Sequence, residues 1–291
     1  MTARSKPVTA LAWIAMLLAS NLPTIIWQAV TGGIVPIWLL VAQECALVAL
    51  LLLTWLARPF APLRGYLLTL LVVSSAFVAY SPLSQSAFWQ AIDRDTTWWQ
   101  DALLRQAPTV IGAIALALTL IGSRLTRRDL ALAPSDPQAI AQRDLVILNF
   151  PRRPWRRAAI WYVTIITGLM LLYLFRHTAL PPDAGPRWAM SLPGVLALAA
   201  LNTVNEEFQY RQVPLARLHG VVGGAQALWL TALLFGISHF YGQPSGYIGV
   251  ALATWFGYLQ AKNMEESRGS TWAYLLHFAQ DVVIFSFVAL V

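Results

Sequence analysis

The stretch SLPGVLALAALNTVNEEFQYR, residues 191–211, decides which class of fold this chain can adopt. It begins as an uncharged and mostly apolar run, and it ends in two adjacent carboxylates, Glu206 and Glu207, followed four residues later by Arg211. Charged side chains inside a lipid bilayer are costly and rare, so those found there usually serve a function. The stretch therefore raises two questions: whether it forms a membrane helix, and what its charges do.

The whole chain has the composition of a polytopic membrane protein. Hydrophobic residues make up 58% of its 291 residues and charged residues 11%, whereas a soluble domain carries about 25% charged residues. Its apolar runs lack strand alternation, and lipid offers no partner for unpaired backbone groups, so the runs are predicted to be helices. We predict an all-α fold with nine spans, or eight spans and one re-entrant or surface segment. The runs are residues 9–30, 34–57, 65–81, 108–122, 158–175, 190–207, 224–241, 246–261 and 271–291.

The first run resembles a signal peptide, with a basic start and an apolar core. Its apolar stretch continues to residue 30, however, and no A-x-A cleavage site ends it. We predict an uncleaved span that is bent at Pro23, because proline removes a helix hydrogen bond. The single cysteine, Cys45, excludes a disulfide framework or a cysteine-based zinc site within one chain. We expect Cys45 to be buried as a small hydrophobe.

The net charge of +7 is concentrated in one loop, since eight arginines and only three aspartates lie in residues 123–157. Such loops stay in the cytoplasm, so we predict a cytoplasmic N-terminus and cytoplasmic loops at 58–64 and 123–157. The loops at 82–107 and 176–189 are predicted to lie outside, as does the C-terminus if there are nine spans. Contact with anionic lipid is compatible with this pattern. Nucleic-acid binding is not expected, because no basic face with exposed aromatic residues is visible on a soluble domain.

The Arg-rich loop divides the sequence into three parts. We predict an N-terminal four-span membrane region at 1–122, the cytoplasmic loop at 123–157 and a C-terminal membrane domain at 158–291. No convincing internal repeat relates the two membrane parts, which weakens a transporter built from inverted repeats. Small residues recur at every fourth position of the eighth run and predict close approach of another helix. These residues are Gly249, Ala253, Gly257 and Ala261.

Polar residues within the predicted spans are confined to the C-terminal domain, and we expect essentially no ionisable side chain in the spans before residue 123. The C-terminal spans contain three pairs at a spacing of four residues, which places each pair on one helix face. The pairs are Glu207 with Arg211, Phe235 with His239, and His277 with Asp281. Further polar residues accompany them: Asn202, Thr203, Asn205, Gln209 and Gln280. His177 and His219 are expected to be solvated.

The spacing also suggests how these residues are paired. Glu207 precedes Arg211 in the favourable order for a helical ion pair. This pairing leaves Glu206 to face another group, about 100° further round the helix. In the last span, the carboxylate of Asp281 could orient the imidazole of His277.

A carboxylate and two imidazoles from three helices can activate water in two ways. In the first, Glu206 is a general base near His239, and His277 helps to stabilise an oxyanion. In the second, Glu206, His239 and His277 hold a zinc ion that activates bound water. The sequence contains no HExxH motif, so a zinc site on a single helix is excluded. We prefer the version without a metal, although the residues leave both open.

Three motifs in order carry a resemblance to a known family: EExxxR at 206–211, FxxxH at 235–239 and HxxxD at 277–281. They resemble the signature motifs of the CAAX protease and bacteriocin-processing enzyme family, also called the Abi family. Its members are intramembrane endopeptidases related to the type II CAAX prenyl proteases. The resemblance covers about residues 190–291, and it implies a helical catalytic core in this part of the chain.

The resemblance also implies roles for individual residues. The water would be activated by Glu206 and His239, and the oxyanion would be stabilised by His277 and its partner Asp281. Supporting roles would fall to Glu207, Arg211 and Phe235. The family often has asparagine at the position of Asp281. An ionised carboxylate cannot donate a hydrogen bond, so Asp281 is expected to be protonated, to orient His277 or to bind a metal.

The function predicted from the sequence is hydrolysis of a peptide bond in a membrane-associated peptide or protein. The arginine-rich composition favours a bacterial cell membrane, and a bacteriocin leader or a similar peptide as substrate. Two alternatives use the same polar residues: a transporter or proton relay, and a non-catalytic immunity or scaffold protein on the same fold. The sequence does not predict an oligomeric state.

Overall fold

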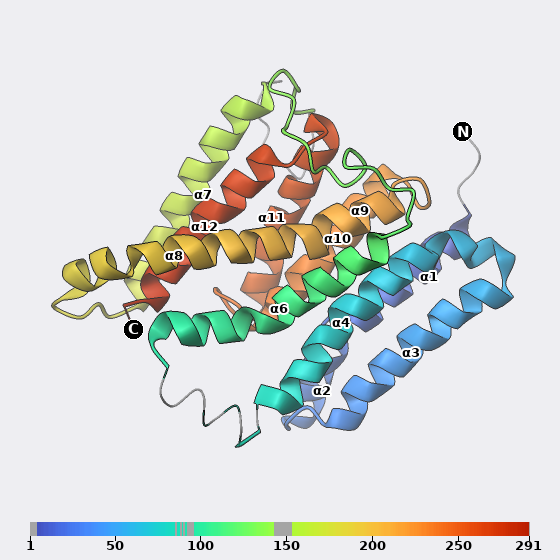
Figure 1. The fold of residues 1–291 in the computed structure, drawn as a ribbon, viewed down its shortest axis with the longest axis horizontal. Coiled ribbons are helices and arrows are strands. Elements are labelled where there is room, and N and C mark those ends of the chain that lie inside the picture. Colours follow the sequence, from blue (N-terminus) through green and yellow to red (C-terminus); the bar gives the residue numbers. More distant parts are fainter. Residues whose placement is uncertain are drawn as a thin grey trace. The chain divides into compact units, whose positions relative to one another are not determined.

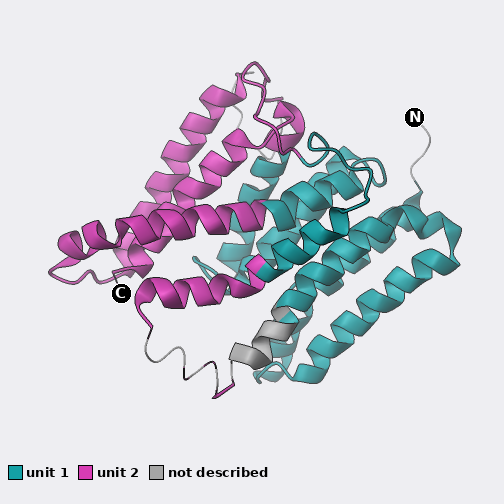
Figure 2. Ribbon diagram, in the orientation of Figure 1, with its two compact units in different colours: residues 1–82, 111–130, 208–262 teal, residues 83–110, 131–207, 263–291 magenta. Residues whose placement is uncertain are grey.

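The protein is described here by a computed structural model that covers residues 5–84, 86–87, 89, 91, 96–142 and 153–290. In these ranges the regular secondary structure is helical (Figure 1), apart from an isolated bridge between Ile140 and Pro154. The predicted all-α class is confirmed. The chain forms two compact units, each built from segments that are distant in sequence (Figure 2). Unit 1 comprises 1–82, 111–130 and 208–262, and unit 2 comprises 83–110, 131–207 and 263–291.

Unit 1 begins with a bent helix pair. The axis turns by 57° between α1 (Lys6–Ala19) and α2 (Leu22–Thr31), and Pro23 lies in the first turn of α2. Proline fits the first turn of a helix but cannot continue a preceding one, so the bend predicted at Pro23 is confirmed. The unit continues with α3 (Ile37–Leu56), η1 (Arg58–Leu63), α4 (Arg64–Ser84) and the end of α6 (Trp98–Leu120). Its last segment holds the π-helical turn η2 (Phe208–Gln212), α9 (Val213–Leu218), α10 (Gly224–Ser238), η3 (His239–Tyr241) and most of α11 (Gly246–Ser267).

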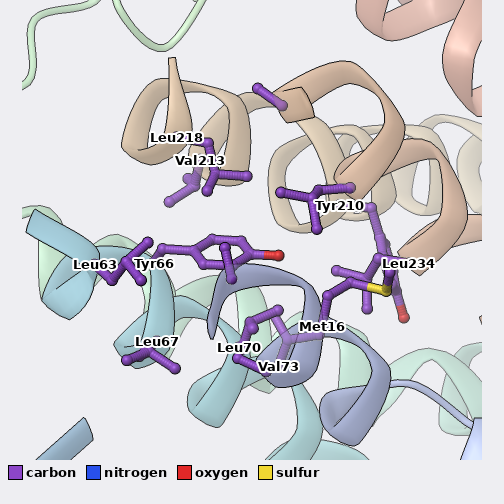
Figure 3. Packing of buried hydrophobic residues seen from close by; sticks show 14 of the residues in the cluster. Met16, Leu63, Tyr66, Leu67, Leu70, Val73, Tyr210, Val213, Leu218 and Leu234 are labelled. Carbon is purple, nitrogen blue, oxygen red and sulfur yellow. The ribbon is translucent and has the colours of Figure 1, made fainter. Parts of the chain in front are cut away.

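An apolar core joins the helices of unit 1. Figure 3 shows Leu63 of η1 and Tyr66 of α4 beside Val213 and Leu218 of α9. These four side chains are at most 1% exposed. Burying an aliphatic or aromatic side chain stabilises a fold by about 1.5–3 kcal/mol in water. The short helix α9 is therefore held against α4 by packing.

Unit 2 contains the start of α6, α7 (Trp155–His177), α8 (Ala184–Glu207), the end of α11 and α12 (Thr271–Val288). Helix α12 contacts both α7 and α8 (Figure 1). On the α7 side, Leu174 packs with Val283 and Phe287. The amide of Gln280 donates a 2.9 Å hydrogen bond to the hydroxyl of Thr167. These contacts fix α12, which carries the third motif, within its unit.

Several helices are long and apolar enough to cross a membrane, which indicates an integral membrane protein. Among the described residues there are five, or six if the bent pair α1 and α2 counts as one span. The five are Ile37–Leu56, Arg58–Ala76, Trp98–Leu120, Trp155–His177 and Thr271–Val288. Each of the nine predicted runs falls on a helix or on the bent pair, and the three beyond these six are α8, α10 and α11. The count of eight or nine spans stays a prediction.

Two residues of α3 differ from expectation. Glu44 is an ionisable residue inside the span Ile37–Leu56, so the expectation of none before residue 123 is wrong. The hydroxyl of Ser75 on α4 donates a 2.7 Å hydrogen bond to its carboxyl group, and such a bond lets a single polar side chain lie in a membrane helix. Cys45, expected to be buried, is exposed. The outer face of a membrane helix meets lipid, so an apolar thiol can lie there.

Some predicted features lie outside the described residues. They include residues 143–152 of the Arg-rich loop and residues 1–4 at the N-terminus, which is predicted to be cytoplasmic. The N-terminus inside the cytoplasm and the three-part division of the sequence both stay predictions.

Candidate active site

Helix α8 ends on the two carboxylates of the first motif. Glu206 and Glu207 are its last residues, and the next five residues form the π-helical turn η2, which contains Arg211. The i to i+5 bonding of a π-helix differs from that of an α-helix, so the angular spacing assumed between Glu207 and Arg211 does not hold. Their predicted ion pair stays a prediction. Turns of this kind occur frequently at functional sites.

The imidazole of His277 lies between the two carboxylates of α8. Its Nδ1 is 2.5 Å from Oε1 of Glu207, and its Nε2 is 3.3 Å from Oε2 of Glu206. The same Nε2 lies 3.7 Å from Oδ2 of Asp281. The side chains of Glu207, His277 and Asp281 are 0%, 4% and 6% exposed, whereas that of Glu206 is 16% exposed. Glu206 is therefore the most accessible carboxylate of this group.

The two nitrogens of His277 have different environments. An ionised carboxylate only accepts hydrogen bonds, so an ionised Glu207 places the ring hydrogen on Nδ1. This leaves Nε2, which faces Glu206, as the nitrogen that can take up or release a proton. A carboxylate on one nitrogen commonly orients an imidazole that acts through the other. The sequence predicted this orienting contact for Asp281, but Glu207 makes the closer one.

Asp281 is held by two residues of α8. The hydroxyl of Thr203 donates a 2.8 Å hydrogen bond to Oδ2 of Asp281, and the amide of Asn202 donates a 3.2 Å bond to the same oxygen. The sequence analysis assigns no role to either donor. Their spacing could have indicated one, since Asn202 and Thr203 each lie four residues before a motif carboxylate and so share its helix face.

Replacing Thr203 by valine should weaken the hold on Asp281. Valine has nearly the same shape as threonine but cannot donate, so a buried carboxyl group loses a partner. Such a loss costs about 1–3 kcal/mol of stability, which thermal unfolding in mild detergent would measure. Thr203→Ser keeps the hydroxyl and is the control. Equal losses in the two variants would show that the methyl group, and not the hydrogen bond, matters at this position.

A second group of motif residues surrounds Phe235 in unit 1. The guanidinium of Arg211 lies 4.0 Å from the centre of the Phe235 ring, and the ring of His239 lies 4.1 Å from it. The Nδ1 of His239 is 2.8 Å from the carbonyl oxygen of Phe235. A carbonyl only accepts, so Nδ1 carries a hydrogen and a neutral His239 has its lone pair on Nε2.

The stripe of small residues on α11 is used for close packing with α10 and η3. A methyl group on Gly257 would lie 3.2 Å from the ring of Phe235 and 3.4 Å from Cα of Ala232. A methyl group on Gly249 would lie 3.1 Å from the carbonyl oxygen of His239. The predicted close approach of a second helix is confirmed, and it supports the segment that carries the second motif.

The structure thus brings the predicted site residues together in two groups, one in each unit. Unit 2 joins Glu206, Glu207, His277 and Asp281, and unit 1 joins Arg211, Phe235 and His239. The predicted contact of Glu206 with His239 links different units and stays a prediction. His177 and His219 are exposed, as expected.

The alternative zinc site also draws on both units, since it combines Glu206 and His277 with His239. Within the described ranges, no group of three or more His, Cys, Asp or Glu side chains is arranged to hold a metal ion. Of the predicted ligands, the structure brings His277 and Glu206 together. Metal binding stays a prediction.

Fold and site together define an all-α membrane protein with a buried cluster of carboxylates and an imidazole on α8 and α12. Residues 187–283 match the family described as type II CAAX prenyl endopeptidase Rce1-like. This part of the chain is similar to that family, which confirms the resemblance carried by the three motifs and suggests a membrane protease. Neither the search of curated proteins nor that of solved structures gave a match.

Proposed function

We propose that this protein is an intramembrane endopeptidase that hydrolyses a peptide bond of a membrane-associated peptide or protein. The observation that carries the proposal is the imidazole of His277, held between the carboxylates of Glu206 and Glu207. This cluster lies in the part of the chain that matches an endopeptidase family. It combines a general base with a hydrogen-bond donor, the two groups that water-mediated peptide hydrolysis needs.

In the proposed mechanism Glu206 is the general base, with His239 as its partner in activating water. Glu206 takes a proton from water while the water oxygen bonds to the carbonyl carbon of the peptide. The carbonyl oxygen becomes an oxyanion and accepts a hydrogen bond from Nε2 of His277, whose ring carries a hydrogen on both nitrogens in this step. The proton held by Glu206 then passes to the leaving nitrogen as the carbon–nitrogen bond breaks. The higher exposure of Glu206 supports its role as the group that meets water.

The remaining residues have positioning roles in this mechanism. Glu207 fixes the ring of His277 through Nδ1, and Arg211 and Phe235 support the segment around His239. Asp281 accepts hydrogen bonds from Thr203 and Asn202 through Oδ2. In the proposed mechanism Asp281 has an orienting role and is not a donor to the oxyanion.

We propose that the reaction needs no metal. Exhaustive treatment with a chelator, followed by dialysis, should leave cleavage by the detergent-solubilised protein unchanged. Loss of activity that zinc alone restores would contradict this and favour the second chemistry, with Glu206, His239 and His277 as ligands. The purified protein would be assayed for zinc content in parallel, so that a tightly held ion is not missed.

We further propose that all nine helical segments cross the membrane, with α8, α10 and α11 added to the six apolar spans. The N-terminus would lie in the cytoplasm of a bacterium and the protein in its cell membrane. Reporter fusions after α4 and after α7 would test this topology. Both fusion points should lie outside the cell, because the loops at 58–64 and 123–157 are predicted to be cytoplasmic. Nine spans would also place the C-terminus outside. Activity of a C-terminal reporter that works only in the cytoplasm would therefore contradict nine spans.

Comparison of membrane peptides from cells with the native protein and with Glu206→Gln tests the function as a whole. Uncleaved substrates should accumulate in the variant. Glu265→Gln, at an exposed position of α11, makes the same chemical change and should have no effect. Loss of solute flux without any change in cleaved peptides would favour a transporter or proton relay. A cellular phenotype that survives Glu206→Gln would favour a non-catalytic immunity or scaffold protein.

A further inference from the structure

Arg217 of α9 is a partly buried cation with no anionic partner among the residues that the structure describes. Its Nε is buried, and no ion pair or hydrogen bond to its guanidinium is found in the described part of the chain. Burial lowers the pKa of Arg217 below its usual value, because removal from water disfavours the charged form. Burial of Nε without a partner among the described residues leaves this guanidinium available to an anionic ligand.

The place of this guanidinium is shaped by a glycine. Gly65 is the second residue of α4, and a methyl group on it would lie 2.7 Å from Cδ of Arg217, 2.9 Å from Nε and 3.0 Å from Nη1. The side chain of Arg217 lies against the first turn of α4 in the space that Gly65 leaves open. Any larger residue would have to displace it.

The backbone around Arg217 is also fixed. Val213 and Leu218 of α9 pack against Leu63 and Tyr66 (Figure 3), so the helix cannot turn without exposing its apolar face. The neighbouring arginine, Arg64, is already engaged, because it donates to the carbonyl oxygen of Thr54 and covers the ring of Trp55. Arg217 thus differs from Arg64 in having no partner within the described ranges, and it extends from a backbone that packing fixes.

We propose that Arg217 and Gly65 form a binding site for the phosphate group of an anionic membrane lipid. The first turn of α4 follows the loop at 58–64 and begins the predicted span 65–81, and lipid phosphates lie at the ends of such spans. The planar guanidinium matches the geometry of a phosphate, to which it can donate two parallel hydrogen bonds. Anionic lipids are attracted to basic residues next to membrane helices on the cytoplasmic side.

Lipid retention measured in nanodiscs tests the site. The native protein would be reconstituted in phosphatidylcholine alone and in phosphatidylcholine mixed with phosphatidylglycerol. Native mass spectrometry would then count the bound anionic lipid, and thermal unfolding would measure its stabilising effect. We expect the Arg217→Gln variant to bind phosphatidylglycerol about ten-fold more weakly, as expected for loss of a hydrogen bond between charged groups.

Two further variants separate the site from general electrostatics. Gly65→Ala keeps every charge but fills the space under the guanidinium, so it should also reduce retention. The control is Arg128→Gln, which removes an exposed arginine of the arginine-rich loop and should change retention little. If Arg217→Gln does not fold in phosphatidylcholine, the site is tested with Gly65→Ala and Arg217→Lys. Lysine keeps the charge but lacks the planar guanidinium, so Arg217→Lys should also reduce lipid retention.

Three outcomes would overturn the proposal. Equal weakening by Arg217→Gln and Arg128→Gln would show diffuse attraction and no site. Unchanged retention in both Arg217→Gln and Gly65→Ala would show that no lipid phosphate binds there. A raised KM for peptide in phosphatidylcholine, with unchanged lipid retention, would assign Arg217 to a peptide carboxylate. Retention is read without any cleavage, and Glu206→Gln should leave it unchanged, so the result is independent of the proposed peptidase activity.

Discussion

Replacing Glu206 by glutamine should lower the rate of peptide cleavage by about 10²–10⁴-fold, the range expected for loss of a general base. Glutamine has the same shape as glutamate but cannot take a proton from water. Glu206 is the least buried carboxylate of the cluster and its contact with His277 is the looser one, at 3.3 Å, so the fold should persist. We therefore expect a fall in kcat with little change in KM, measured with a cleavable peptide in detergent or liposomes.

Two comparisons make this result specific to the proposed base. Glu265→Gln should retain native activity, and the unfolding temperature of Glu206→Gln should stay close to that of the native protein. His239→Ala and His277→Ala should also be severely impaired. Full activity in all three active-site variants would show that the mechanism is wrong.

Replacing Glu207 by alanine should destabilise the protein more than any other single change in the cluster. Glu207 is fully buried, and its carboxylate makes the 2.5 Å contact with Nδ1 of His277. Removing one member of a buried ionic pair costs about 3–5 kcal/mol, because the other member stays buried without its partner. We expect a marked fall in unfolding temperature, together with loss of activity, since the imidazole is no longer oriented.

The conservative variant Glu207→Gln separates charge from hydrogen bonding. Its amide oxygen can still accept from Nδ1, so it should retain more stability than alanine. Combining Glu207→Ala with His277→Ala measures the contact itself, and residues that touch show coupling of about 0.5–3 kcal/mol in such cycles. If the effects of the two alanine substitutions simply add, the contact does not explain the stability of this site.

Much of the fold was readable from hydrophobic runs. A backbone in lipid must satisfy its own hydrogen bonds, so runs such as 34–57 and 158–175 had to be helices, and the structure has α3 and α7 there. The bend at Pro23 followed from proline chemistry, and the close packing of Gly257 from its missing side chain. The spacing of polar residues does not single out Glu44, because it is a lone carboxyl group whose hydroxyl partner, Ser75, lies on a neighbouring helix.

The sequence predicted which residues belong to the candidate site, but it did not predict which of them are in contact. Spacing of four residues correctly placed His277 and Asp281 near one another, and it held the information that Thr203 shares a face with Glu207. It could not show the π-helical turn after Glu207, because that turn changes the angular spacing on which the argument depends. It also could not show that both Glu206 and Glu207 approach the same imidazole.

The sequence by itself determined that this is a helical membrane protein, and it singled out the charged and polar residues worth explaining, because local hydropathy and residue spacing are properties of a single segment. Only the tertiary structure decided that Glu207, and not Asp281, makes the closest contact with His277, and that Arg217 lies on Gly65. Those relations join α8 to α12 and α4 to α9. They depend on how separate helices pack, which the spacing within one helix does not encode.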